Sequence, residues 1–449
     1  MYVYWENEQG EWGCDFTYMD LLFDFLVPLG MYPYVELGFL PRQLAAREYR
    51  MFDRASVIAA PRDMSRWHDL IRCVTEHLVR RYGRSVVRRW KFTTISVNHV
   101  FLGCMTMEEY ETLYETTYHA VKSVDADLPF GGPGCWTELF DQKDGFAAFM
   151  RAAKERGCIP DFIAFQSYPT LDISTDPLFL GYAKNQQYVP AVLSRDPSYL
   201  SHAVDRLEHL LSQHTDEMKE FFCEEMSSTV WQRDLSNDTS YKAAWIAKNI
   251  TENAGRMVFG YWSLSDLMNE RAYWQQLFHG GYGLLTSNGI PKASYFGLLF
   301  CSRLGTEKLS EGPGWIFTRD ADGWQLLIYH YCHYRPVYCY RYRKLTHEED
   351  AYTVFEAGEL RHLRFSWPDA ADGLYRMEQR RIGRECGSAY DAWLWLGAPQ
   401  EVSAEQTEFL QHKAHPDYET TLVKANNGLR WNVDLQPLDT VLICMRKEQ

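Results

Sequence analysis

Residues 19–39 read MDLLFDFLVPLGMYPYVELGF, a stretch in which a helix pattern is followed directly by a strand pattern. Four apolar side chains recur at the spacing of an amphipathic helix, namely Met19, Leu22, Phe23 and Leu26. Gly30 is a typical residue just beyond a helix end. Residues 34–39 then form an apolar run that is short enough for a buried strand. This stretch therefore predicts one α/β unit.

The same alternation continues through the first two thirds of the chain. Further helical stripes cover residues 71–78, 110–121, 146–153, 200–207 and 243–250. Strand-like runs lie between the stripes, at residues 34–39, 90–97, 128–131, 162–166, 221–224 and 258–262. Alternating strands and helices are typical of a parallel sheet covered by helices, and a barrel is the natural closure of such a sheet.

The strands are too few for a complete barrel. Six are predicted before Pro291 opens a last helix that runs to Leu304, whereas a (β/α)8 TIM barrel has eight. Either residues 2–5 supply one more strand or the chain begins inside the barrel of a larger protein. We therefore predict an α/β fold over residues 1–305, a (β/α)8 TIM barrel lacking its first one or two strands. A barrel interrupted in this way is expected to be an oligomer or to need an N-terminal segment.

The pattern changes after residue 304. Apolar side chains there alternate with polar ones, as in a half-exposed strand, at residues 315–318, 324–329, 360–367 and 440–444. This pattern predicts a C-terminal all-β sandwich domain over residues 306–449. Residues 310–314, Ser-Glu-Gly-Pro-Gly, are the expected joint between the two domains.

Composition restricts the partners and the compartment. The 46 Lys and Arg residues against 60 Asp and Glu residues give a net charge of −14, which repels phosphate backbones and argues against direct nucleic-acid binding. No apolar run approaches the roughly 20 residues that cross a bilayer, and the acidic N-terminus differs from a signal peptide. The eleven cysteines form no CxxC pair, which argues against zinc and disulfides. We expect a cytoplasmic protein without contact to membranes.

Aromatic residues and acids suggest a binding cleft. Phe, Trp and Tyr make up 15% of the chain, and flat aromatic faces suit the stacking of sugars. In a barrel the site forms at the carboxyl ends of the strands, where several acids are predicted: Glu36, Glu224, Glu225 and Asp266. For any one of these acids, a helix cap or a salt bridge is the plainer interpretation.

Several segments together resemble glycoside hydrolase family 39, the β-xylosidase family. In the barrel they are residues 34–41, 131–134, 259–266, 278–285 and 289–292. Residues 384–393 and 397–400 resemble part of the family's C-terminal β-domain. The resemblance implies a (β/α)8 barrel with an appended β-sandwich, retaining chemistry on a xyloside or related sugar, and no cofactor or metal.

The resemblance also implies which residues carry the chemistry. Glu224 matches the nucleophile, although Glu225 and Met226 depart from the residues that usually follow it. The acid/base glutamate should stand at Val97, which has no proton to give. His99 is the nearest titratable substitute, and a loop histidine facing solvent is its plainer interpretation.

The sugar subsite implied by the resemblance is partly kept. Phe39, Tyr168, Trp262 and Glu270 match residues that line the subsite. Gln166 stands where the family has a histidine, and Asn269 where it has a glutamate. For Phe39 and Trp262, ordinary core packing is an equal alternative.

A looser likeness leaves the function open. Residues 231–239 and 329–334 resemble family 39 domains fused to AraC-type transcription regulators, although this chain contains no basic helix-turn-helix. The first hypothesis is therefore a catalytically impaired sugar-binding domain that senses sugar within a regulator. The second is an active retaining β-glycosidase that hydrolyses O-glycosyl bonds with Glu224, and the third is a structural domain.

Overall fold

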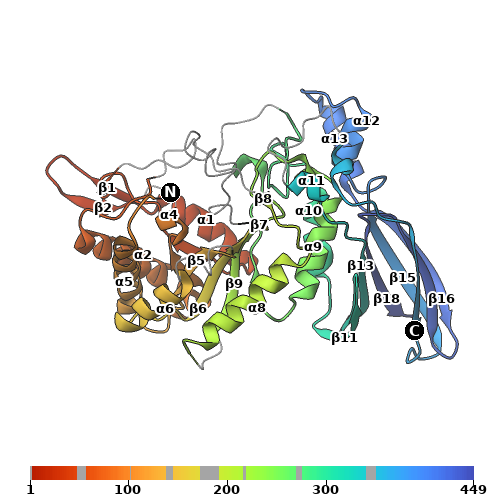
Figure 1. The fold of residues 1–449 in the computed structure, drawn as a ribbon, viewed down its shortest axis with the longest axis horizontal. Helices are drawn as coiled ribbons and strands as arrows, with labels where there is room; N and C mark the ends of the chain where they lie inside the picture. The colour runs from red at the N-terminus through yellow and green to blue at the C-terminus, as the bar shows by residue number, and fades with distance from the viewer. Residues whose placement is uncertain are drawn as a thin grey trace. The chain divides into compact units, whose positions relative to one another are not determined.

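The computed structural model describes residues 3–47, 57–101, 103–137, 145–171, 192–215, 219–268, 276–339 and 350–448 (Figure 1). These residues form two compact units. The first comprises Met1–Ser167, Ala203–Met226 and Arg256–Gly260, and the second comprises Tyr168–His202, Ser227–Gly255 and Tyr261–Gln449. The predicted domain boundary at residue 305 remains a prediction.

A parallel sheet forms the centre of the first unit. Its strands are β3 (Tyr34–Leu37), β4 (Lys91–Thr94), β5 (Gly131–Trp136), β6 (Phe162–Ser167), β9 (Glu220–Met226) and β10 (Val258–Phe259). β3 pairs with β4, and the other four pair in the order β10-β9-β6-β5. A parallel bridge between Phe92 and Phe130 connects the two groups. Five of the six predicted strands are thereby confirmed, and the sixth, β5, is displaced along the chain.

β5 differs from its prediction in position. The sequence Gly131-Gly-Pro-Gly134 is typical of a turn, so the strand was expected to end at residue 131. In the structure the strand begins there and continues to Trp136, with a register shift between Pro133 and Cys135. An irregular strand can accept a proline and glycines that a regular ladder would not.

Helices pack along the strands of the first unit (Figure 1). They are α1 (Thr17–Leu26), α2 (Met64–Tyr82), α3 (Arg84–Val87), α4 (Asn98–Phe101), α5 (Met107–Val124) and α6 (Gly145–Glu155), with the 3-10 helix η1 (Val27–Leu29). α8 (Tyr199–Ser212) belongs to both units. Side-chain caps define two starts: Asp63 accepts from the backbone of α2, and Thr106 and Glu109 form a capping box on α5.

The described strands of the first unit do not close into a ring. β3 has no described strand partner other than β4. The sheet nevertheless curves. The evidence is that Tyr34 of β3 stacks on Phe222 of β9, with ring centroids 4.5 Å apart. The short strand β1 (Tyr4–Glu6) pairs with β2 (Trp12–Cys14) in an antiparallel hairpin. Of the residues considered for a further barrel strand, Tyr4 and Trp5 therefore lie in this hairpin instead, because the polar turn after Glu6 folds the chain back on itself.

Antiparallel sheets dominate the second unit after residue 306. Six strands pair in the order β11-β12-β13-β18-β15-β16: β11 (Glu307–Gly312), β12 (Trp315–Asp320), β13 (Gly323–Tyr329), β15 (Gly373–Ile382), β16 (Asp417–Ala425) and β18 (Thr440–Lys447). β14 (Arg361–Trp367) pairs with β17 (Leu429–Leu435). One apolar core contains side chains of both sheets, such as Leu326 and Val433. This is the face-to-face packing predicted for the β-domain.

Residues 310–314 do not form an interdomain joint. Glu311 pairs with Ile316 and Gly312 with Trp315, so this segment is the tight turn of the β11–β12 hairpin. Gly314 takes a positive φ of 83° at this turn. Glycine and proline thus marked a hairpin rather than a linker.

The second unit also contains helices and short elements. They are β7 (Thr170–Leu171), β8 (Val192–Leu193), η4 (Leu235–Asp238), α9 (Tyr241–Glu252), η5 (Asp266–Met268), α10 (Ala293–Ser302), α11 (Pro336–Cys339), η6 (Ala351–Val354), α12 (Ala389–Trp395) and α13 (Ala404–Ala414). α9 packs against α10, which explains why nearly all of its side chains are buried. Within the described parts of the chain, no helix combines the length and the apolar content needed to cross a membrane.

Candidate active site

Side chains from three parallel strands of the first unit meet at Glu224. This half-buried residue lies on β9, where its carboxylate accepts a hydrogen bond from the Tyr34 hydroxyl of β3. The amide Nε2 of Gln166, on β6, donates to the same carboxylate at 3.1 Å. A register shift between β6 and β9 lies beside Glu224, because Phe165 pairs with Cys223 but Gln166 pairs with Glu225. Such bulges are frequent beside active sites, where they redirect a side chain.

The protonation state of Glu224 depends on its burial and on its two hydrogen bonds. Burial raises the pKa of Glu224 to about 7, and the hydrogen bonds from Tyr34 and Gln166 act in the opposite direction. The two donors favour the ionised form, whereas the surrounding protein favours the neutral one. Near neutral pH this carboxylate is therefore present in both forms.

Gln166 is held in place by a further amide. Asn98 donates from Nδ2 to Oε1 of Gln166 at 2.9 Å, while the backbone N–H of Trp136 donates to Oδ1 of Asn98 at 2.8 Å. Because the oxygen of Gln166 is engaged by Asn98, its nitrogen faces Glu224. Asn98 is thus a positioning residue for the donor on Glu224.

Gly134 provides the space in which the carboxylate lies. Its φ is +69°, and a Cβ atom at this position would lie 2.6 Å from Oε1 of Glu224 and 3.2 Å from Cα of Ser96. A larger residue would therefore collide with both strand ends. The same distances place Ser96, and hence the end of β4, directly beside the carboxylate.

The position predicted for the acid/base residue contains no acid. Val97 follows Ser96, is only 1% exposed, and donates its N–H to the carbonyl of Pro133 at 3.0 Å. His99 lies in α4 rather than in a loop open to solvent, and burial lowers its pKa to about 4. A histidine with this pKa is neutral at pH 7. Neither residue can supply a proton readily at neutral pH.

The predicted sugar-binding residues are distributed over the two units. Phe39 follows β3, is 46% exposed, and its ring centroid lies 6.5 Å from that of His99 in the same unit. Tyr168 and Trp262 belong to the second unit, where Tyr168 is buried near Tyr282. Glu270 and the neighbouring Asn269 lie outside the described residues.

Asp266, one of the strand-end acids, has a structural role. Its side chain is fully buried in the second unit and lies 2.7 Å from the ammonium of Lys292. Its other oxygen accepts from the backbone N–H of Gly283 at 2.8 Å. For this acid the salt bridge was the correct interpretation.

Two residues that contact the site were missed in the sequence. Tyr34 and Asn98 are 190 and 126 positions away from Glu224, although Tyr34 begins the predicted strand at residues 34–39 and Asn98 follows Val97 directly. The alternation of β3 was a usable signal, because Tyr34 and Glu36 must face the same side of that strand. Among the described residues, no group of three or more His, Cys, Asp or Glu side chains could hold a metal ion.

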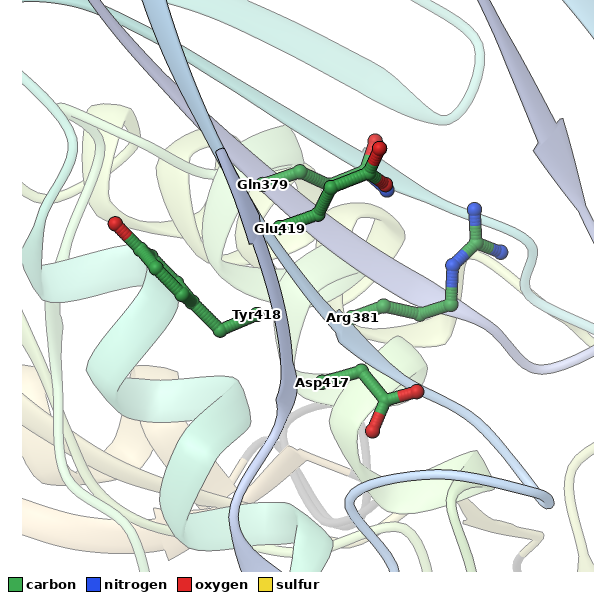
Figure 2. A pocket seen from close by; sticks show the side chains of 5 residues that line it. All are labelled: Gln379, Arg381, Asp417, Tyr418 and Glu419. Atoms are coloured by element: carbon green, nitrogen blue, oxygen red, sulfur yellow. The ribbon is translucent and has the colours of Figure 1, made fainter. Parts of the chain in front are cut away.

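A separate pocket of about 280 Å³ lies on the β-domain (Figure 2). It is lined by Gln379, Arg381, Asp417, Tyr418 and Glu419 from β15 and β16. Figure 2 shows Tyr418 on the side of the strands opposite to Arg381, as the alternation along a strand requires. Arg381 also forms an ion pair with Asp439 at 2.5 Å. This pocket contains none of the residues predicted for catalysis.

This chain is similar to one family of known proteins over most of its length. The model of glycosyl hydrolases family 39 matches residues 1–430. A β-xylosidase of Geobacillus stearothermophilus is 26% identical over 92% of this chain and 77% of its own length. A β-xylosidase of Caldicellulosiruptor saccharolyticus is 30% identical over 69% of this chain and 60% of its own length, so this chain spans less than two thirds of that relative.

Solved structures show the same fold. A monomeric β-xylosidase from Caulobacter crescentus superposes with a TM-score of 0.81 at 23% identity, covering 98% of this chain and 86% of that one. The family 39 enzyme from Xanthomonas axonopodis pv. citri superposes with a TM-score of 0.82 at 20% identity, covering 99% and 85%. These neighbours imply a TIM-barrel domain with a C-terminal β-domain. The chain belongs to glycosyl hydrolase family 39.

Proposed function

We propose that this protein is a retaining β-glycosidase that hydrolyses the O-glycosyl bonds of xylosides or related glycosides, with Glu224 as the nucleophile. The observation that carries the proposal is the pair of hydrogen bonds that Tyr34 and Gln166 donate to Glu224. They orient the carboxylate and favour the ionised form that a nucleophile needs. The sugar class follows from the relatives, which are named β-xylosidases.

The proposed reaction has two steps. An oxygen of Glu224 attacks the anomeric carbon while the glycosidic oxygen receives a proton and departs as an alcohol. Water then attacks the glycosyl–Glu224 ester from the opposite face, so that the sugar leaves with its original configuration. Phe39, Tyr168, Gln166, Trp262 and Glu270 are proposed to surround the sugar, as the family resemblance implies.

A mechanism-based label tests the nucleophile. A 2-deoxy-2-fluoro xyloside with a dinitrophenol leaving group needs little acid assistance, and the fluorine slows the second step. We expect a mass increase of one glycosyl group per chain, located by peptide mapping at Glu224. Protection by xylose would connect the label to a sugar site. A protein that stays unlabelled, or that is labelled at another carboxylate, would contradict the proposal.

A second candidate function is sugar binding without turnover, as in the sensing module of an AraC-type regulator. The observation that favours it is the enclosed Val97 at the acid/base position. The two functions differ in a simple assay. A sensor would bind xylose, with a change in tryptophan fluorescence, and would not release phenol from any aryl xyloside.

Removal of the Tyr34 hydroxyl tests the charge of Glu224. In Tyr34→Phe, the acidic limb of kcat/KM is expected to move upward by roughly one pH unit, because loss of a hydrogen bond to the carboxylate raises its pKa further. Glu224 attacks only when it is deprotonated, so activity rises with pH through this pKa. The measurement is a pH profile with dinitrophenyl xyloside.

A matched control is Tyr82→Phe, which removes a 2.9 Å hydrogen bond from a tyrosine to Asp24 elsewhere in the same unit. Its profile should match that of the unmodified protein. An unchanged acidic limb in Tyr34→Phe would show that this hydrogen bond does not control the nucleophile.

A further inference from the structure

We propose that Glu36 is the general acid and base of this site, in the role that Val97 cannot perform. The inference rests on the proposed function, since it assumes that Glu224 is the nucleophile. Retaining hydrolysis needs a second carboxyl group beside the nucleophile. Neither Val97 nor the neutral His99 provides one.

Strand geometry places Glu36 opposite Glu224. β3 and β9 run in the same direction, as the parallel pairings through β4, β5 and β6 show. Tyr34 of β3 stacks on Phe222 of β9. Glu36 follows Tyr34 by two residues on β3, so its side chain lies on the face of that strand from which the Tyr34 hydroxyl reaches Glu224. The Glu36 carboxyl group therefore lies on the side of β3 that faces the Glu224 site, nearer the carboxyl end of the strand than Tyr34.

The neighbourhood of Gly38 shows where the Glu36 carboxyl group points. A Cβ atom on Gly38 would lie 3.3 Å from Oε1 of Glu36 and 2.0 Å from Cγ2 of Ile95. The carboxyl group thus extends over Gly38, towards the strand ends at which active sites of barrels form. The Glu36 side chain is exposed, so that a glycosidic oxygen and later a water molecule can reach it.

The raised pKa of Glu36 suits the role of a general acid beside Glu224. Although water reaches Glu36, the surrounding protein raises its pKa well above the usual value, and the charges of Glu224 and Glu225 raise it further. A raised pKa favours the protonated form of Glu36, which is the form that a general acid needs.

The proton balance of the two steps is complete. In the first step the Glu36 carboxylic acid gives its proton to the glycosidic oxygen, the bond from that oxygen to the anomeric carbon breaks, and Glu224 forms an ester with this carbon. In the second step the Glu36 carboxylate takes a proton from water, whose oxygen attacks the anomeric carbon and releases the Glu224 carboxylate. The net reaction is glycoside plus water to sugar plus alcohol.

The test compares leaving groups in Glu36→Gln and Glu36→Ala. With phenyl xyloside, whose phenol needs protonation, kcat/KM is expected to fall by about 10²- to 10⁴-fold. With dinitrophenyl xyloside, kcat/KM should stay near that of the unmodified protein, with a burst of dinitrophenol followed by slow turnover. The basic limb of the pH profile should disappear, which a purely structural role would not cause.

Azide provides an independent readout. It attacks the glycosyl–Glu224 ester without help from a base, so it should accelerate turnover in Glu36→Ala and yield a β-glycosyl azide. The matched control is Glu220→Gln, at the other end of β9, where Glu220 pairs with Lys91 on the surface. This control should keep the kinetics and pH profile of the unmodified protein.

Two kinds of failure can be separated. Suppose that the fluoro sugar labels the unmodified protein at Glu224. If both Glu36 variants then hydrolyse phenyl and dinitrophenyl xyloside as the unmodified protein does, and keep the basic limb of its pH profile, Glu36 is not the acid and only this inference fails. An equal loss of kcat/KM with phenyl and dinitrophenyl xyloside in the Glu36 variants, without a glycosyl azide product, would also overturn this inference. If Glu224 is never labelled, the proposed function itself fails. Circular dichroism confirms that each variant is folded.

Discussion

Hydrolysis of aryl β-xylosides is expected to fall by about 10⁴-fold or more in the Glu224→Gly variant. This residue receives the hydrogen bonds of Tyr34 and Gln166, and it is the proposed nucleophile. Without it, no covalent glycosyl intermediate can form. The measurement is kcat/KM with dinitrophenyl xyloside, for which protonation of the leaving group is not limiting.

The stereochemistry of rescue makes this prediction specific. Azide can enter the space that Glu224 vacates in Glu224→Gly and attack the anomeric carbon directly. The product should be an α-glycosyl azide, with the configuration inverted, whereas Glu36→Ala should yield the β-azide. Glu220→Gly, on the same strand, should retain normal activity without azide. Substantial hydrolysis by Glu224→Gly alone would show that another group is the nucleophile.

A loss of about 3–5 kcal/mol in the free energy of unfolding is expected for Lys292→Met. Lys292 lies fully buried in the second unit, 2.6 Å from Asp238 and 2.7 Å from Asp266, both of which are fully buried as well. Burial opposes its charge, but the two carboxylates keep the pKa of Lys292 above its usual value. The methionine variant would leave two buried carboxylates without a cation. Urea unfolding followed by circular dichroism measures the difference.

The control for Lys292→Met is Lys308→Met. Lys308 pairs with Glu311 at 2.7 Å on the surface of the β-domain, where both side chains are about half exposed. Its loss should change the free energy of unfolding by less than about 1 kcal/mol. Similar effects of the two substitutions would show that the buried ion pairs do not stabilise this unit.

The element order of the first two thirds could be predicted because it depends on local patterns. The helical stripe in residues 19–26 and the apolar run at residues 162–166 correspond to α1 and β6. Such periodicities arise when one face of an element is buried, and they are visible without knowledge of the partner. The prediction of an interdomain joint at residues 310–314 was wrong. Glycine and proline indicate that the chain changes direction, but they do not indicate whether the segments on either side belong to one hairpin or to two domains.

The candidate site could be predicted only in part. The resemblance to family 39 singled out Glu224 and Val97, and their roles stay predictions. For Tyr34 the alternation of β3 indicated only the side of the strand, and Asn98 had no signal, because their contacts depend on how distant strands curve towards each other. The opposition of Glu36 and Glu224 likewise appears only when Tyr34 is seen stacked on Phe222.

The sequence by itself determined the alternating parallel strands and helices, the antiparallel β-domain after residue 306, and the glutamate at the end of β9. Each of these depends on short-range spacing or on a local motif. The tertiary structure decided which side chains share the site, and it assigned Asp266 to a buried ion pair instead. The physical reason is that hydrogen bonds, ion pairs and pKa values depend on distances between residues far apart in the chain, and packing alone sets those distances.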